Sequence, residues 1–222
     1  MASIILAIIA VGISLGAGVI AFIALWKTHL TGFSPIVITG NLRHHIYPVT
    51  KKERKWYICS FDIPISITNG GAKPGNILGL RLSLSFPELQ LPGNRELFPP
   101  VFEIDPRDYA KLTHDRFKLK EIVIGGWMPY TVLPKQSVIK HLLFESRWDE
   151  PVIQERILCS LELYTDRSPK WKEVAKWEIS LTADKWDFLE KGNSWFYQPL
   201  GSPKLEEPLR PTDLHKYTRE AS

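Results

Sequence analysis

The chain has 222 residues, a net charge of +4 at pH 7 and two cysteines. This length fits one domain of ordinary size together with terminal extensions. Two cysteines exclude a disulfide-rich scaffold, and the modest charge lacks the dense basic stripe of a nucleic-acid-binding protein. We therefore expect no nucleic-acid partner.

The first element is a long apolar stretch, residues 4–26, which contains no charged side chain. At about 1.5 Å per residue it would form a helix roughly 34 Å long, enough to cross a hydrocarbon core of about 30 Å. Trp26 and Lys27 end it as an aromatic belt residue and a charged stop end a membrane span. The sequence predicts a single-pass transmembrane anchor over residues 1–27, embedded in a lipid bilayer.

The residues at the two ends of this stretch predict whether it is cleaved or retained and how it is oriented in the membrane. No basic side chain precedes it, and it is longer than the core of a signal peptide, so we expect a retained anchor. Basic residues follow it, and the positive-inside rule then places the soluble domain in the cytoplasm. The basic segment 51–55 could approach anionic headgroups, although a solvated turn is the simpler interpretation.

Small residues recur in the middle of the predicted helix. Gly12 and Gly16 form a GxxxG pair, and Ser14 and Gly18 repeat the spacing. Small residues four apart let two helix backbones approach closely in lipid. This pattern predicts a helix-packing face, with the chance occurrence of glycine in membrane helices as the alternative.

Two long alternating segments follow the predicted linker, residues 28–34, and an extended stretch, residues 35–48. The apolar residues that fall on one face are Tyr57, Cys59, Phe61, Ile63, Ile65 and Ile67 in the first segment and Leu78, Leu80, Leu82, Leu84 and Phe86 in the second. A period of two predicts strands. Pro64 lacks an amide donor, which suggests that the first strand lies at an edge or carries a bulge there. The loop between them, Thr68–Asn76, is rich in glycine and asparagine and long enough to cross between sheets.

The second half of the chain continues in the same manner. We expect strands near residues 101–104, 138–144, 153–164 and 170–182, a helical turn over 106–114, and a short helix over 183–190 capped by Thr182 and ended by Gly192. In the last strand the predicted inward residues are Trp171, Ala175, Trp177, Ile179 and Leu181. Seven or eight alternating strands predict an all-β, antiparallel, immunoglobulin-like sandwich over residues 35–191, with an open barrel as the alternative.

The segments DIPISITNGGAKPGNILGLRLSLSF and VLPKQSVIKHLLFE, placed after an N-terminal anchor, carry a family resemblance. The chain resembles bacterial single-pass membrane-anchored proteins with an immunoglobulin-like β-sandwich, whose functions are uncharacterised. The resemblance covers about half of the chain. It implies a fold and brings no catalytic residue with it.

The sequence offers few groups that could carry chemistry. Cys59 and Cys159 are predicted to face the core, either as a disulfide between sheets or, more simply, as buried thiols. His44 and His45 are adjacent on a strand and would point to opposite faces, so they cannot converge on one ion. We find no phosphate loop, nucleophile elbow or catalytic constellation, and expect a protein that is not an enzyme and uses no cofactor or metal.

The segment 192–222 contains four prolines and few apolar residues, so it cannot form a core of its own. We expect it to wrap a partner through Trp195, Phe196, Tyr197, Leu200, Leu205, Leu209 and Leu214. With the helix-packing face, this tail indicates an accessory or structural subunit of a larger membrane complex, whose partners are other membrane-protein subunits. The alternative is a membrane-anchored domain that binds a glycan or lipid through exposed Trp127, Trp148 and Trp195.

Overall fold

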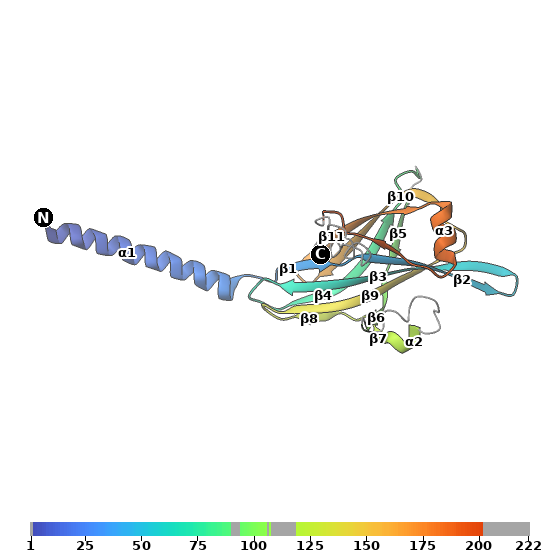
Figure 1. Cartoon of the computed structure of the whole chain (residues 1–222). Coiled ribbons are helices and arrows are strands. Elements are labelled where there is room, and N and C mark those ends of the chain that lie inside the picture. Colours follow the sequence, from blue (N-terminus) through green and yellow to red (C-terminus); the bar gives the residue numbers. More distant parts are fainter. Residues whose placement is uncertain (1, 90–93, 106, 108–118, 202–222) are drawn as a thin grey trace, which may run out of the picture.

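The structure, a computed structural model, describes residues 2–89, 94–105, 107 and 119–201. Its first element is α1 (Ala2–Leu25), which continues as one π-helical turn over Trp26–Leu30. The helix over Ser3–Leu30 is long and apolar enough to cross a membrane. It projects away from the rest of the molecule (Figure 1), and it extends three residues past the predicted end of the anchor.

The remaining chain folds into two antiparallel sheets, as predicted. The seven-stranded sheet has the order β12-β2-β3-β9-β6-β7, with β1 also paired to β3. Its strands are β1 (Pro35–Thr39), β2 (Leu42–Lys51), β3 (Arg54–Asn69), β6 (Pro100–Ile104), β7 (Val123–Gly126), β9 (Ser137–Trp148) and β12 (Trp195–Tyr197). The five-stranded sheet has the order β11-β10-β4-β5, with β8 also paired to β4. Its strands are β4 (Gly75–Ser85), β5 (Arg95–Phe98), β8 (Tyr130–Val132), β10 (Gln154–Thr165) and β11 (Ser168–Leu181).

The described residues contain twelve strands, more than the seven or eight expected. The difference comes from short strands of three to five residues, such as β8 and β12, which are too short to show an alternating pattern. Two short helices complete the fold, α2 (Leu119–Ile122) and α3 (Ala183–Glu190). Thr182 occupies the N-cap position of α3 without a side-chain cap bond, and Gly192 follows the helix with a φ of +86°. The helical turn expected over 106–114 lies outside the described residues.

The core forms where the apolar faces of the two sheets meet. Alternate residues of β3 from Tyr57 to Ile67 are buried, and they face β4 and β10 side chains of the opposite sheet. The largest fully buried side chain is Trp177 of β11. Burial of each such large apolar side chain stabilises the fold by roughly 1.5 to 3 kcal/mol, so the core supplies most of the favourable free energy.

Two predicted core residues lie on the outside because β-bulges reverse the alternation. Leu161 of β10 pairs with Ala175, but the next residue pairs with Glu173, so Val174 is an extra residue in β11. Beyond this bulge Trp171 turns outward and is 39% exposed. A second register shift, in the pairing of β10 with β4, leaves Leu78 exposed.

Pro64 marks an interruption in the seven-stranded sheet. Strand β3 lies inside the sheet, between β1 and β2 on one side and β9 on the other, so it is not an edge strand. The Pro64 carbonyl accepts a hydrogen bond from the Gly40 amide at 2.9 Å, at the point where β1 ends and β2 has not begun. Pro64 therefore lacks its amide hydrogen at the gap between β1 and β2, where no paired strand residue would accept a hydrogen bond from it.

Cys59 and Cys159 are free, buried thiols on opposing sheets, which confirms the simpler prediction. Burial raises the pKa of both thiols. His44 also faces this core: its ring stacks on Phe61 with centroids 4.4 Å apart, and its Nε2 lies 3.3 Å from the Cys59 sulfur. Burial, and then the neighbouring His45, lower the pKa of His44 to about 3.

The buried His44 should make stability depend on pH. Because its folded pKa is below the unfolded value near 6.5, the unfolded chain binds a proton between pH 6.5 and about 3 that the folded chain does not. The free energy of unfolding therefore falls as pH decreases through this range, by about 2 kcal/mol between pH 7 and pH 5. His44→Leu should lose this contribution. Urea unfolding at both pH values tests it, and an identical pH dependence in wild type and variant would contradict it.

Candidate functional site

The short linker between α1 and the sandwich is bound along its length to the loop between β3 and β4. The Ala72 amide donates to the Thr31 carbonyl at 3.0 Å, and the Gly70 amide donates to the Ser34 carbonyl at 2.9 Å. The Ser34 amide donates to Oδ1 of Asn69 at 3.3 Å. Since the first of these bonds is made one residue after the helix ends, little free chain separates the helix from the domain.

Asn69 is the centre of this junction, and its side chain is fully buried. Its Nδ2 donates to the carbonyls of Lys73 at 2.8 Å and Val132 at 3.2 Å, and its Oδ1 also accepts from the Gly71 amide at 2.9 Å. Its backbone bonds to the turn between β8 and β9, which contains Gln136. One amide side chain therefore joins the linker and two loops. We call residues 31–34 and 69–72 together the anchor socket.

Two glycines are required for the close packing around the anchor socket. A Cβ on Gly71 would lie 1.8 Å from the Gly32 carbonyl oxygen, and a Cβ on Gly75 would lie 2.0 Å from Cγ of Phe33. Phe33 is 9% exposed and packs against the main core. The glycine-rich loop is thus more than a crossover between sheets. The sequence feature that could have indicated this packing is Phe33, a large apolar residue inside a short linker.

The turn between β2 and β3 lies at the opposite end of the domain. Strand β3 has 16 residues, so at about 3.3 Å per residue its ends are roughly 50 Å apart. Asn69 is at the end near α1, and Arg54 is at the far end (Figure 1). This placement agrees with the simpler interpretation of segment 51–55 as a solvated turn and disfavours contact with headgroups beside the anchor, because the two long strands carry this turn away from the helix.

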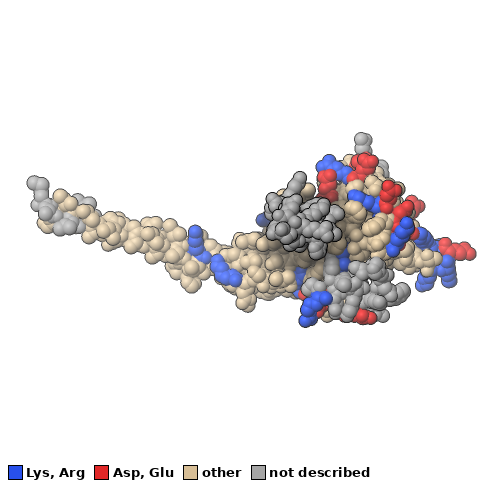
Figure 2. Space-filling view, viewed as in Figure 1, with Lys and Arg blue, Asp and Glu red and all other residues tan. Residues whose placement is uncertain are grey.

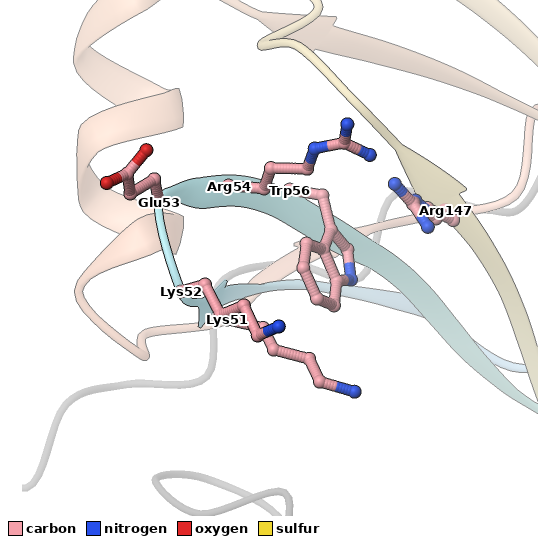
Figure 3. A pocket seen from close by; sticks show the side chains of 6 residues that line it. All are labelled: Lys51, Lys52, Glu53, Arg54, Trp56 and Arg147. Atoms are coloured by element: carbon pink, nitrogen blue, oxygen red, sulfur yellow. The ribbon is translucent and has the colours of Figure 1, made fainter.

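The far end carries an open hollow of about 640 Å³, lined by Lys51, Lys52, Glu53, Arg54, Trp56 and Arg147. Figure 3 shows the lysines and Trp56 directed to the same side of the hairpin, with Arg147 pointing toward the indole from β9. The Arg147 guanidinium carbon is 4.8 Å from the centre of the Trp56 ring. We call these six residues the distal hollow. The sequence showed the charged turn but could not place Arg147, which reaches it through the pairing of β3 with β9.

A buried polar cluster cross-links three strands midway along β3. Nε of Arg43 donates to Asp62 at 2.7 Å, and Nε2 of His141 is 2.9 Å from the other carboxylate oxygen. His45 approaches Asp62 at 3.8 Å. Burial, and then the charge of Arg43, lower the pKa of His45 to about 4, and the opposing effect of Asp62 does not compensate for them. His45 is therefore neutral at pH 7 and forms no ion pair with Asp62. All four side chains are closed to solvent, which indicates a structural role.

The structure places the predicted interaction residues in different surroundings. Gly12, Ser14, Gly16 and Gly18 lie on exposed parts of α1, and their role in helix packing stays a prediction. Trp195, Phe196 and Tyr197 form β12, which pairs with β2, so the sandwich extends beyond the predicted boundary at residue 191. Tyr197 is buried against the domain itself, and Leu200 is exposed. Leu205, Leu209 and Leu214 lie outside the described residues.

The tryptophans predicted to be exposed do not form one surface. Trp148 is 5% exposed and belongs to the core, so it offers no platform. Trp127 is half-buried and packs against the same core. Trp195 is 38% exposed, in edge-to-face contact with Phe188 and with the Lys185 ammonium 4.9 Å from its ring centre.

No protein-family model matches the chain. No curated protein matches it either. Among solved structures, it is similar to the crystal structure of an inferred lipoprotein, YcdA, from Bacillus subtilis, with 14% sequence identity and a TM-score of 0.36. The similarity covers 73% of this chain and 41% of that chain, so this chain spans about two fifths of that protein's length. A likeness at this TM-score does not establish a shared fold or function.

Replacement of the socket asparagine should loosen the junction. Asn69→Ala leaves buried amide and carbonyl groups of the linker and loops without partners, at about 1 to 3 kcal/mol for each unsatisfied group. We expect the free energy of unfolding to fall by at least about 2 kcal/mol. The matched control is Asn76→Ala, because Asn76 bonds to Asp166 at the surface. Denaturant unfolding of both variants in micelles tests this, and equal losses would contradict a special role of Asn69.

Proposed function

We propose that this chain is a membrane-anchored accessory or structural subunit of a larger membrane protein complex, in which α1 holds the sandwich at the bilayer. The observation that carries the proposal is the anchor socket. Its hydrogen bonds fix the linker to the domain within one residue of the helix end. The sandwich would therefore keep one orientation relative to the helix.

A fixed orientation is useful when both partners are held in the same membrane. A domain on a free tether loses much orientational freedom when it binds, whereas a preorganised domain has already lost it. The distal end of the sandwich would be held roughly 50 Å from the anchor socket, at a set position over a neighbouring subunit. Such placement suits a structural subunit and requires no catalytic group.

The surface of the helix supports the same role. Figure 2 shows α1 as a nearly uncharged rod, while charged side chains gather on the half of the domain far from it. The small residues Gly12 and Gly16 would let a second helix approach closely in lipid. The exposed Trp195 and Phe196 on the edge strand β12 add an aromatic contact surface outside the membrane.

The subunit role predicts co-migration with other membrane proteins. Purified from native membranes in mild detergent, the chain should migrate with other subunits, and Gly16→Leu should weaken this association because it blocks close helix approach. A shortened chain ending at Gly201 tests the tail while keeping β12 intact. Ala17→Leu changes the same helix between its small-residue positions and serves as the control. Migration as a lone monomer, unaffected by these changes, would defeat the proposal.

A second candidate function is glycan binding, favoured by the surroundings of Trp171 on the five-stranded sheet. Its ring reaches over Gly79, where a Cβ would be only 2.7 Å from the ring, and the Arg81 guanidinium carbon is 4.0 Å from the ring centre. Tyr164 lies beside it with centroids 5.4 Å apart. A partly exposed indole supported in this way is a platform on which a sugar ring could stack.

Glycan binding can be separated from the subunit role by one variant. Trp171→Ala should abolish binding of the full chain to a glycan array, since it removes the platform. Leu78→Ala, which truncates another exposed side chain of the same sheet, should leave binding unchanged. If the wild-type chain binds no glycan, or if Trp171→Ala binds as well as wild type, this second candidate is excluded.

A further inference from the structure

We propose that the distal hollow is a docking site for a short acidic segment of a partner protein. The inference rests on the proposed function, because the partner would be a subunit of the same membrane complex. It assigns a chemistry to that partner and a place where the partner binds.

The first support is uncompensated positive charge. Among the residues that the structure describes, Lys51, Lys52 and Arg54 take part in no ion pair, and all three are exposed. Their neighbours are different, since Lys55 pairs with Glu190 and Arg147 donates to Asp149 at 2.6 Å. The lining holds four cations and one carboxylate, Glu53, and Asp149 offsets the charge of Arg147, which leaves an excess of two positive charges at the hollow. An incoming carboxylate would meet favourable charge without displacing an existing partner.

The second support is the backbone of the hairpin turn. Lys51 pairs with Arg54, which leaves Lys52 and Glu53 as the two turn residues. Lys52 has a φ of +58°, a left-handed conformation that favours glycine at the first position of such a turn. The chain thus keeps a lysine where glycine would relieve strain. Strained residues cluster at functional sites; Lys135, in the turn before β9, shares this φ, but here the strained residue lines the hollow (Figure 3).

The third support is the pairing of tryptophan with arginine. The half-buried Trp56 and the Arg147 guanidinium are in cation–π contact. Trp and Arg are among the residue types that are enriched in the hot spots of protein interfaces. Nε and Nη2 of Arg147 already donate to Asp149, so the guanidinium offered to a partner's carboxylate is that of Arg54, which could make two parallel hydrogen bonds where a lysine cannot. The lining therefore resembles the centre of a protein–protein contact more than a solvated turn.

The borders of the hollow favour a short acidic segment over a long polyanion. Glu53 lines the hollow and Asp149 pairs with its Arg147, and Figure 2 shows acidic and basic side chains mixed over this end of the domain. A nucleic acid or a phosphate polymer would extend past the cations and meet these carboxylates. The headgroups of the anchoring bilayer are disfavoured as the partner, since the hollow lies roughly 50 Å along β3 from the anchor socket.

The test measures peptide binding by the full chain in nanodiscs of zwitterionic phosphatidylcholine, with fluorescent hexaglutamate as the probe. Wild type should bind hexaglutamate at low ionic strength, and affinity should fall as salt is added. Lys52→Gly should bind about threefold more weakly although it relieves backbone strain, and a triple variant, Lys51→Gln with Lys52→Gln and Arg54→Gln, more than about tenfold more weakly. Lys170→Gln removes one positive charge, as Lys52→Gly does, but from β11 of the five-stranded sheet. This variant should bind hexaglutamate as wild type does.

Three results would overturn the inference: no binding of hexaglutamate by wild type, equal binding by wild type and the triple variant, or tighter binding of tripolyphosphate than of the peptide. The two proposals also fail in different ways. A chain that migrates with other membrane subunits but does not bind hexaglutamate retains the subunit role and loses the docking site. A chain that binds hexaglutamate through these cations but migrates alone retains the docking site and loses the subunit role.

Discussion

The buried amide of Asn69 is the interaction on which the arrangement of this molecule depends. It bonds to the linker after α1, to the loop between β3 and β4, and to the carbonyl of Val132 at the end of β8. A buried amide with all its hydrogen bonds made is stabilising, and the same group left unpaired would be destabilising. The junction is therefore selective for one geometry, and the close contact of Gly71 with Gly32 restricts it further.

Strand β3 carries this geometry to the other end of the domain. It begins in the distal hollow, passes through the cluster of Arg43, Asp62 and His141, and ends at Asn69. Breaking a buried charge pair of this kind is strongly destabilising, so the cluster holds β2, β3 and β9 in register. Strand β3 thus connects the anchor socket, to which the helix linker is bonded, with the distal hollow, so an orientation set at the membrane is kept at the far end.

The sequence predicted the parts of the fold that depend on local pattern. The helix α1 was recognisable from its unbroken apolar length, β3 from the period of two that burial of one face imposes, and α3 from Thr182 and Gly192 at its ends. Trp171 and Leu78 were misplaced because a bulge shifts the face of every residue beyond it, and a bulge is defined by the partner strand.

The functional surfaces depend on contacts that sequence distance does not show. Arg147 joins the distal hollow only through the pairing of β9 with β3. The segment 51–55 is near α1 in the chain and far from it in space, because β1 and β2 together run along the length of β3 before the turn. The role of Asn69 was hidden for a related reason: a loop rich in glycine and asparagine looks like an ordinary connection until its hydrogen-bond partners are known.

The rigid connection between helix and sandwich can be measured by energy transfer to the membrane. A donor dye would be attached at Lys73→Cys beside the anchor socket or at Lys52→Cys in the distal hollow, in nanodiscs that contain acceptor-labelled lipid. Cys59 and Cys159 are buried and should not react with the dye. A rigid connection predicts strong transfer from position 73 and weak transfer from position 52, with Asn69→Ala increasing transfer from position 52. Equal transfer from both positions in the wild-type background would show that the domain moves freely on its anchor, and would contradict a rigid connection.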